Sequence, residues 1–448
     1  MKPRFLAACA LLVGCRDAPE GHRLTGPLYT PTPLDACTPA ADTYCGAETR
    51  SVLDMPHQGF ESFYGYASAL PATQHPHARV AYTRYWWDEL EPQPGAIRFD
   101  VLDAALADAE TAHETFAFRV MPEESSEGAR RVPAWLADAA GGTWGSHQGG
   151  PRYFSPDYAH PAFLGAATRT ITALGARYDG DPRLDHVDVG FVGDSGEWAY
   201  AVDGASMPSQ TVTESLLDAF VRAFPHTPVL MSIGAVDDGG RPLAAAVARG
   251  MGWRFDCWGD IRHGWNHHDA FIEPQIVAAG AVDVWRHAPV VVETCGEMGL
   301  WALLGYDDAQ VRWTLRWALD HHVLLINNKS RAVPTQWRPL VDEYLSYAGA
   351  RLLVRQVTRV GADVRVRLVN RGTTPPYRAW HLVARVRGAS EVVDATSLSG
   401  LTDTYEVTLT LPASSGPVDV SVRDERGSAV PLANEGAASD GWLEVFGR

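Results

Sequence analysis

The stretch from Arg79 to Pro122 places the strongest constraint on the fold of this 448-residue chain. It contains, in order, a β-type run (RVAYTRYWWDEL), a loop (EPQPGAIRFD), a helical run (VLDAALADAETAH) and a second β-type run (ETFAFRVMP). Two parallel strands can be joined only by a long connection, so this order predicts a parallel pair with a crossover helix. If the unit recurs, the fold is a barrel or a doubly wound sheet, with its chemistry in the loops that follow the strands.

Strand-like runs do recur between residues 59 and 348, and helical runs separate them. Eight strands is the count of a (β/α)8 barrel, whereas a doubly wound sheet rarely needs eight. We therefore predict an α/β fold in which residues 56–348 form a (β/α)8 TIM barrel. The eight runs are FESFYGYA, ARVAYTRYW, ETFAFRVMP, LDHVDVGFVGDSGEW, PVLMSIG, GWRFDCWGD, APVVVETCGE and HHVLLINNKS.

After Tyr347 the sequence changes to a period-two alternation of apolar and polar residues. Short runs of this kind, separated by turn residues at roughly ten-residue spacing, are typical of antiparallel sheets packed face to face. We predict a smaller all-β sandwich domain over residues 349–448. Its strand-like runs are RLLVRQVTRV, ADVRVRLVNRG, AWHLVARVRG, TYEVTLTLP and VDVSVRDE.

The N-terminus has the pattern of an export signal. Lys2 and Arg4 precede an apolar run that ends in Leu-Val-Gly-Cys at Cys15. This tetrapeptide resembles a bacterial lipobox, which implies a lipoprotein signal peptide over 1–15 and lipidation of Cys15, while Arg16 would favour outer-membrane sorting. An ordinary signal peptide or a buried strand is the alternative.

These features predict an exported outer-membrane or cell-surface lipoprotein, which would be periplasmic or secreted if the lipobox is not used. The membrane is then a partner only through the N-terminal lipid anchor. Residues 16–55 are rich in Pro, Thr, Ala and Asp without periodicity, so we expect a flexible tether there.

Export makes the remaining cysteines informative. Cys37, Cys45, Cys257 and Cys295 are an even number, as suits an oxidising compartment. We predict a disulfide between Cys37 and Cys45, whereas Cys257 and Cys295 could form a disulfide or remain a free buried pair. None of the cysteines has zinc-site spacing, so no metal and no cofactor are expected.

Composition excludes two further classes of function. Hydrophobic residues make up 46 % of the chain and charged residues 21 %, which argues for a globular protein and against a disordered chain or a membrane bundle. The net charge of −16 would repel a phosphate backbone, so nucleic acid is not an expected partner.

Two glutamates follow predicted barrel strands, where the active site of a barrel lies. Glu197 comes after the fourth strand, and Glu293 ends the seventh. Two carboxylates that face each other across a cleft are what glycoside cleavage requires, one as an acid and one as a nucleophile or base. Glu297 is the alternative nucleophile and Asp194 the alternative to Glu197.

One stretch resembles a known family. The W-x-x-L-E-P-x-x-G-x-x-x-F stretch from Trp87 to Phe99, together with the two glutamates, is similar to clan-A glycoside hydrolases. The resemblance implies a retaining mechanism with Glu197 as acid/base and Glu293 as nucleophile. An Asn usually precedes the acid/base in that clan, whereas Gly196 stands here, and Asn327 or Asn328 could supply the polar contact instead.

The C-terminal stretch VRLVNRGTTPPYRAWHLV is similar to the DUF4832 family of bacterial secreted proteins.

Within the clan-A-like stretch, Glu91 lies in a loop, where we expect it to shape the turn into the following helix.

Other residues near the strand ends could bind a sugar. Flat aromatic rings stack on sugar faces, although core packing is an equally open explanation for the loop tryptophans. Arg84 and Arg119 could bind substrate or simply pair with the glutamates. His263, His267 and His268 could ligate a metal, but such loops are more often solvated. The complete substrate-binding set that we predict is Arg84, Trp86, Arg119, Asp194, Trp198, Trp258, His263, Asn327 and Glu297.

The sequence as a whole predicts a surface-anchored glycoside hydrolase whose partner is a carbohydrate, an oligo- or polysaccharide. A non-catalytic carbohydrate-binding lipoprotein with a degenerate barrel is the first alternative, and a structural or adhesive surface protein is the second. A separation of more than about 10 Å between the two carboxyl groups would exclude the enzyme, because glycosidase carboxyl pairs lie roughly 5 to 9.5 Å apart.

Overall fold

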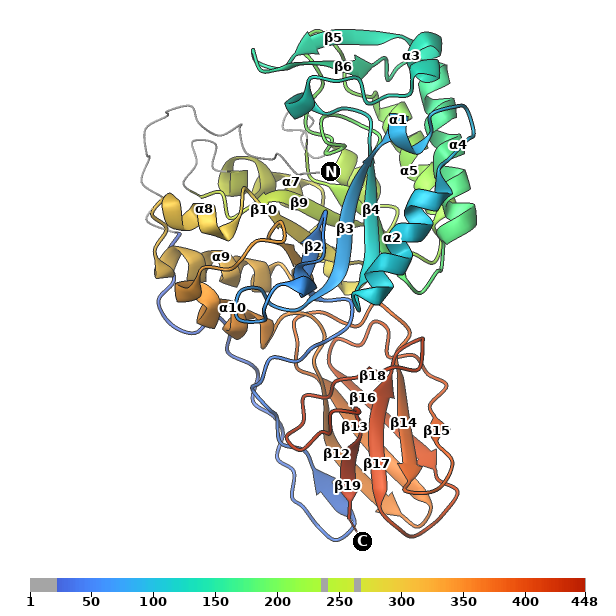
Figure 1. Ribbon diagram of the computed structural model, residues 1–448. Helices are drawn as coiled ribbons and strands as arrows, with labels where there is room; N and C mark the ends of the chain where they lie inside the picture. Colours follow the sequence, from blue (N-terminus) through green and yellow to red (C-terminus); the bar gives the residue numbers. More distant parts are fainter. Residues whose placement is uncertain (1–21, 235–240, 262–266, 448) are drawn as a thin grey trace.

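The computed structural model describes residues 22–234, 241–261 and 267–447, and its larger part is a closed barrel of eight parallel strands (Figure 1). The predicted (β/α)8 barrel is therefore confirmed. All eight predicted runs contain a barrel strand. Around the barrel the strands follow the order β10 (Val290–Thr294), β11 (Leu325–Asn327), β2 (Gly59–Phe63), β3 (Ala78–Trp86), β4 (Thr115–Met121), β7 (Leu184–Val189), β8 (Val229–Ser232) and β9 (Gly252–Trp258).

Helices cover the outside of the barrel (Figure 1). In α4 (Pro161–Tyr178), Phe163, Ile171 and Leu174 are buried at helical spacing. Among the described residues, no helix combines the length and the hydropathy needed to cross a bilayer. The other helices are α1 (Trp87–Leu90), α2 (Phe99–Thr111), α3 (Ala134–Ala140), α5 (Gln210–Ala223), α6 (Arg241–Val247), α7 (Glu273–Ala278), α8 (Met298–Leu303), α9 (Asp308–Asp320) and α10 (Arg338–Leu345).

The inner face of the barrel changes from apolar to polar along the strands. Val291 pairs with Leu325 across β10 and β11, and two residues further on Glu293 pairs with Asn327. Because alternate residues of a strand point to the same side, all four side chains face the interior. The amino ends of the strands thus form an apolar plug, and the carboxyl ends present polar groups. The plug residues are Val80, Tyr82, Ala117, Leu230, Val291, Leu324 and Leu325.

The smaller part consists of two antiparallel sheets that contribute to one hydrophobic cluster. Val366 of the first sheet and Val420 of the second are both fully buried in this cluster. The first sheet has the order β1 (Thr43–Cys45), β12 (Leu352–Val360), β13 (Asp363–Asn370) and β16 (Thr404–Thr410). The second has the order β15 (Val392–Val393), β14 (His381–Val386), β17 (Val418–Arg423) and β18 (Ala429–Val430), with β19 (Leu443–Phe446) also on β17.

Residues 22–55 do not form the flexible tether that we predicted. β1 pairs antiparallel with β12, Leu28 is fully buried in the barrel core, and Met55 is buried with the two sheets. Single apolar residues and an added edge strand hold this segment, and neither leaves a periodic pattern in the sequence. Cys37 and Cys45 form a disulfide beside β1. Cys15 and the rest of the predicted signal lie outside the described residues.

The segment after α3 contains a hairpin. β5 (Gly142–Ser146) pairs with β6 (Arg152–Pro156), and Trp144 on β5 is 45 % exposed. The glycine-rich turn between the strands is a hairpin signal that the sequence interpretation did not use.

The two sheets lie against the amino ends of the barrel strands (Figure 1). Arg378 donates hydrogen bonds to the carbonyl oxygens of Leu184 and Asp185, both 2.6 Å away, at the start of β7. Gln58, just before β2, accepts a 2.8 Å hydrogen bond from the backbone N–H of Ala350. This placement leaves the carboxyl ends of the strands free of the second part.

Glu91 holds the turn after β3, as we expected. Its buried carboxylate accepts hydrogen bonds from the indole of Trp87 at 2.9 Å, from the backbone N–H of Gly95 at 2.8 Å and from the hydroxyl of Thr170 at 2.5 Å. One side chain therefore ties the loop to both α1 and α4.

We predict that Glu91→Ala lowers the free energy of unfolding by about 2 kcal/mol, because it leaves buried donors without an acceptor. Urea unfolding followed by tryptophan fluorescence measures the change. Glu89→Ala, at an exposed position of the same helix, serves as the control and should change it by less than about 0.5 kcal/mol. Equal effects of the two substitutions would contradict the role of Glu91.

Candidate active site

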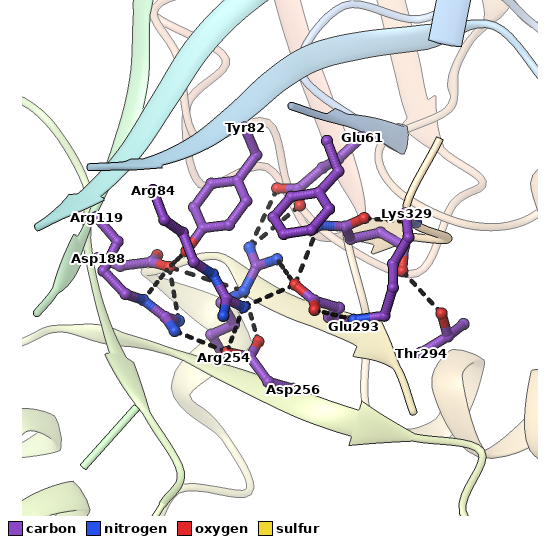
Figure 2. A network of polar contacts seen from close by, with 12 residues as sticks. Glu61, Tyr82, Arg84, Arg119, Asp188, Arg254, Asp256, Glu293, Thr294 and Lys329 are labelled. Atoms are coloured by element: carbon purple, nitrogen blue, oxygen red, sulfur yellow. Dashed lines mark hydrogen bonds and ion pairs between the residues drawn. The ribbon is translucent and has the colours of Figure 1, made fainter. Parts of the chain in front are cut away.

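A cluster of charged side chains fills the carboxyl end of the barrel, and we refer to it as the charged cluster (Figure 2). Buried charges must be paired to offset the loss of their hydration. In this cluster each guanidinium group contacts at least two carboxylates. The charged cluster consists of Glu61, Arg84, Arg119, Asp188, Glu197, Arg254, Asp256, Glu293 and Lys329.

Arg84 of β3 joins the two predicted catalytic glutamates. Its Nη1 donates to Glu197 Oε1 at 2.7 Å, and its Nη2 donates to Glu293 Oε2 at 2.9 Å. Two hydrogen bonds and one rigid guanidinium cannot span more than about 8 Å, so the bonded oxygens of the glutamates are no further apart than that. This satisfies the distance limit set from the sequence for a carboxyl pair.

Within the described residues, Glu293 accepts more hydrogen bonds than any other carboxylate of the charged cluster. Its Oε2 accepts from Arg84 at 2.9 Å, from Arg254 at 3.1 Å and from Asn327 at 3.1 Å, whereas its Oε1 contacts only Lys329 Nζ among the described residues. Burial opposes its charge, but Arg84, Lys329 and Arg254 together hold the pKa of Glu293 below its usual value. Glu293 is therefore an ionised carboxylate with one anchored oxygen.

Glu197 lies on a tight loop after β7 and is more accessible, with 31 % of its side chain exposed. The loop is fixed by backbone hydrogen bonds from Ser195 to Glu123 at 3.0 Å and from Trp198 to Val192 at 3.1 Å. Burial raises the pKa of Glu197 to about 7, against the opposing effect of Arg84. Glu197 is thus protonated under conditions in which Glu293 is ionised.

Gly196 has a structural reason to stand where clan-A enzymes usually have Asn. Its φ is +66°, and an added Cβ would lie 3.1 Å from Cδ of Arg119 and 3.2 Å from the carbonyl oxygen of Val120. A side chain there would meet both backbone strain and close contacts. The loop that presents Glu197 therefore favours glycine.

Asp256 of β9 is a carboxylate that bonds three arginines of the charged cluster. It accepts hydrogen bonds from Arg119 at 2.8 Å, from Arg254 at 2.7 Å and from Arg84 at 3.0 Å. Burial alone would raise the pKa of Asp256, but Arg119 and then Arg254 and Arg84 lower it well below its usual range. This carboxylate keeps the three guanidinium groups in place.

The lower layer of the charged cluster contains two further acids. Asp188 accepts from the hydroxyl of Tyr82 at 2.6 Å and from Arg119 at 2.9 Å. Glu61 accepts from Arg254 at 3.1 Å, and burial raises the pKa of Glu61 to about 7. These acids face the apolar plug and support the arginines from below.

Two of the predicted aromatic contacts are wrong. Trp198 is 2 % exposed and donates its indole N–H to the carbonyl of Val189, and Trp258 is fully buried against Trp301. Both rings belong to the core, so neither can stack on a sugar. Trp86 is half-buried, and the guanidinium carbon of Arg131 lies 3.7 Å from its ring centre.

Of the remaining predicted residues, the structure brings Arg84, Arg119 and Asn327 to the charged cluster. Asp194 instead ties two loops together, because it accepts from the backbone N–H and the hydroxyl of Ser125, both at 2.7 Å. Glu297 precedes α8 and makes no hydrogen bond or ion pair to the cluster within the described part of the chain. His263 lies outside the described residues.

Sequence reasoning missed several cluster members. Arg254 and Asp256 alternate along β9, and a charged residue at every second position of a strand is a signal that a polar interior could have explained. Lys329 has no such signal, since it follows β11 in a loop with a φ of +54°. Tyr64 is not a member of the cluster, but it was also missed. It is 45 % exposed, and the charges of Arg84 and Glu293 act on its hydroxyl group.

No family model and no curated protein matches this chain. Solved structures that resemble it in part are glycoside hydrolases. The catalytic domain of the major endoglucanase of Xanthomonas campestris pv. campestris is 10 % identical, with a TM-score of 0.36, 67 % of this chain and 99 % of that chain covered. An exo-β-1,4-mannosidase of Opitutaceae bacterium strain TAV5 is 13 % identical, with a TM-score of 0.37 and coverages of 68 % and 58 %. An α-galactosidase of Thermus thermophilus is 10 % identical, with a TM-score of 0.39 and coverages of 72 % and 66 %.

These likenesses are too low to assign an activity to this chain.

We predict that Glu197→Gln raises the melting temperature at about pH 8 and changes it less at about pH 5. The pKa of Glu197 is raised from 4.5 to about 7, so the cost of ionising this group on folding grows between these two values and is complete above pH 7. At pH 5 the folded protein still holds the carboxyl group neutral, and only a small part of that cost is present. Thermal melts of both proteins across this range measure the difference. Glu89→Gln, at an exposed position, is the control, and a constant effect of Glu197→Gln would contradict the raised pKa.

Proposed function

We propose that this protein is a glycoside hydrolase that cleaves an oligo- or polysaccharide with Glu197 and Glu293. One observation carries the proposal: a single guanidinium holds two carboxyl groups within about 8 Å whose pKa values are shifted in opposite directions. A pair of titratable groups driven apart in this way provides an acid and a nucleophile at the same pH.

The two glutamates take different roles in this proposal. Glu197 donates its proton to the glycosidic oxygen as the bond from the anomeric carbon to that oxygen breaks. Glu293 attacks the anomeric carbon through Oε1, because its Oε2 is held by Arg84, Arg254 and Asn327. Water then cleaves the glycosyl–enzyme ester, with Glu197 now acting as the base.

Lys329 has a specific place in this scheme. Its ammonium group contacts Oε1 of Glu293, the oxygen proposed to attack, and its side chain is 29 % exposed. It helps to keep Glu293 ionised and has further N–H groups that a substrate hydroxyl can accept from. A retaining outcome follows if Glu293 forms the ester. The first-formed anomer, read by proton NMR, distinguishes it from inversion.

A non-catalytic carbohydrate-binding protein is the second candidate. It is favoured by Gly196, where clan-A enzymes usually have Asn, and by the cationic contacts to both oxygens of Glu293. In that case the charged cluster would bind a glycan without cleaving it.

Export and lipidation at Cys15 are proposed on the N-terminal sequence alone. A lipid there would make this a surface-anchored hydrolase. Processing without the lipobox would leave it periplasmic or secreted.

We predict that Glu197→Gln and Glu293→Gln each reduce hydrolysis by about a thousandfold or more while glycan binding is retained, because the amides keep the shape but supply neither the proton nor the nucleophile. A panel of oligo- and polysaccharides is screened first for reducing-sugar release by the parent protein, and the variants are then tested on the active glycan. Glu297→Gln is the matched control and should retain activity. Binding without hydrolysis in the parent would favour the second candidate, and the absence of both would exclude carbohydrate as the partner.

We predict a bell-shaped pH profile for kcat/KM whose alkaline limb, set by Glu197, lies near pH 7. Its acidic limb reports Glu293 and lies below the usual carboxyl value. Lys329→Ala should move the acidic limb upward, because it removes a cation that lowers the pKa of Glu293. Arg331→Ala in the same loop should leave both limbs in place. An unchanged acidic limb in Lys329→Ala would contradict the role of Lys329.

A further inference from the structure

A second group of reactive side chains lies beside the charged cluster, on the same two strands. Cys257 is the penultimate residue of β9, directly after Asp256, and Cys295 follows β10 two residues after Glu293. The two cysteines form a disulfide across neighbouring strands. Both are only partly buried, so reductants and metal ions can reach the pair.

Asp260 and His267 complete this group. One ligand atom from each of Cys257, Asp260, His267 and Cys295 can be chosen so that all four lie within 4.8 Å of one another. Zinc bonds of about 2.0 to 2.3 Å place tetrahedral ligands up to roughly 4 Å apart, so only small side-chain movements separate this arrangement from a metal centre. We refer to these four residues as the thiol site.

Asp260 gives the thiol site a feature that a surface acidic cluster lacks. Its carboxylate is fully buried, and its Oδ2 contacts Nδ1 of His267. Buried carboxylates are commonly paired or bound to a metal. The position also follows from the chain, since Cys257 and Asp260 are separated by only two residues and the barrel brings Cys295 from the next strand.

Of His267 and His268, the two described histidines of this loop, His267 is the suitable ligand. His268 is fully buried, and its Nε2 already accepts a 2.7 Å hydrogen bond from the backbone N–H of Gly259. His268 is therefore committed to holding the loop. Two sulfurs, one imidazole and one carboxylate form a donor set that suits zinc better than calcium or magnesium.

We propose that the thiol site binds one Zn²⁺ when its disulfide is reduced, and that the disulfide and the zinc ion are mutually exclusive occupants of the ends of β9 and β10. Reduction breaks the S–S bond and gives two thiols, at the expense of an external thiol or phosphine reductant that is oxidised. Zinc then forms two Zn–S bonds, and the two thiol protons pass to solvent. This inference does not depend on the proposed glycosidase activity.

The test is equilibrium dialysis of the tag-free protein against buffered zinc, followed by metal analysis by mass spectrometry. The oxidised protein and the protein reduced with a phosphine, which takes its oxygen from water to become the phosphine oxide, are compared. We expect about one zinc ion per chain after reduction and almost none in the oxidised protein. Cys295→Ser and His267→Ala should each lose most of the bound zinc after reduction.

The chain provides a matched control in its other disulfide. The double variant Cys37→Ser/Cys45→Ser removes that pair, which lies beside β1 and away from the thiol site, and should still bind about one zinc after reduction. Circular dichroism and thermal melts establish that each variant is folded before its zinc content is compared. The proposal is overturned if the folded, reduced parent binds no zinc, or if folded Cys295→Ser and His267→Ala both retain it.

Discussion

The guanidinium of Arg84 is the interaction on which the candidate site depends. It bonds Glu197 on a loop, Glu293 on β10 and Asp256 on β9, and so fixes three segments that are far apart in the sequence. A lysine could not replace it, because only a planar fork can address several carboxylates in fixed directions. The same contacts divide the two glutamates into a neutral acid and an ionised partner, because Glu293 has further cations around it and Glu197 is held mainly by Arg84.

A buried charged layer of this size imposes conditions on the rest of the barrel. Each guanidinium needs its acids within reach, so alternate inward positions of neighbouring strands have to carry opposite charges at matched heights, as Arg119 and Asp188 do. The apolar plug below excludes water and strengthens every one of these pairs. The two antiparallel sheets pack at the amino ends, which leaves the carboxyl ends, where Glu197 and Lys329 are partly exposed, accessible to a substrate.

The barrel could be predicted from the sequence because each strand-and-helix unit carries its own periodicity and its own turn residues. That Glu197 and Glu293 lie close together could be predicted because strand ends meet at one face of a barrel. Core tryptophans could not be told from sugar-binding ones, since Trp198 and Trp258 have the same sequence context as an exposed ring and only packing distinguishes them. The contacts of residues 22–55 and of Lys329 depend on partners far away in the chain, which local patterns do not reveal.

Gly196 shows how a departure from a family pattern can have a local cause. An Asn before the acid/base would carry a Cβ against Arg119 and Val120, in a backbone conformation that favours glycine. Arg119 in turn cannot move away, because it bonds Asp188, Ser232 and Asp256. An asparagine at this position would require Arg119 or the carbonyl group of Val120 to shift. Gly196 therefore has a cause in the packing of this barrel, whichever of the two candidate functions the site performs.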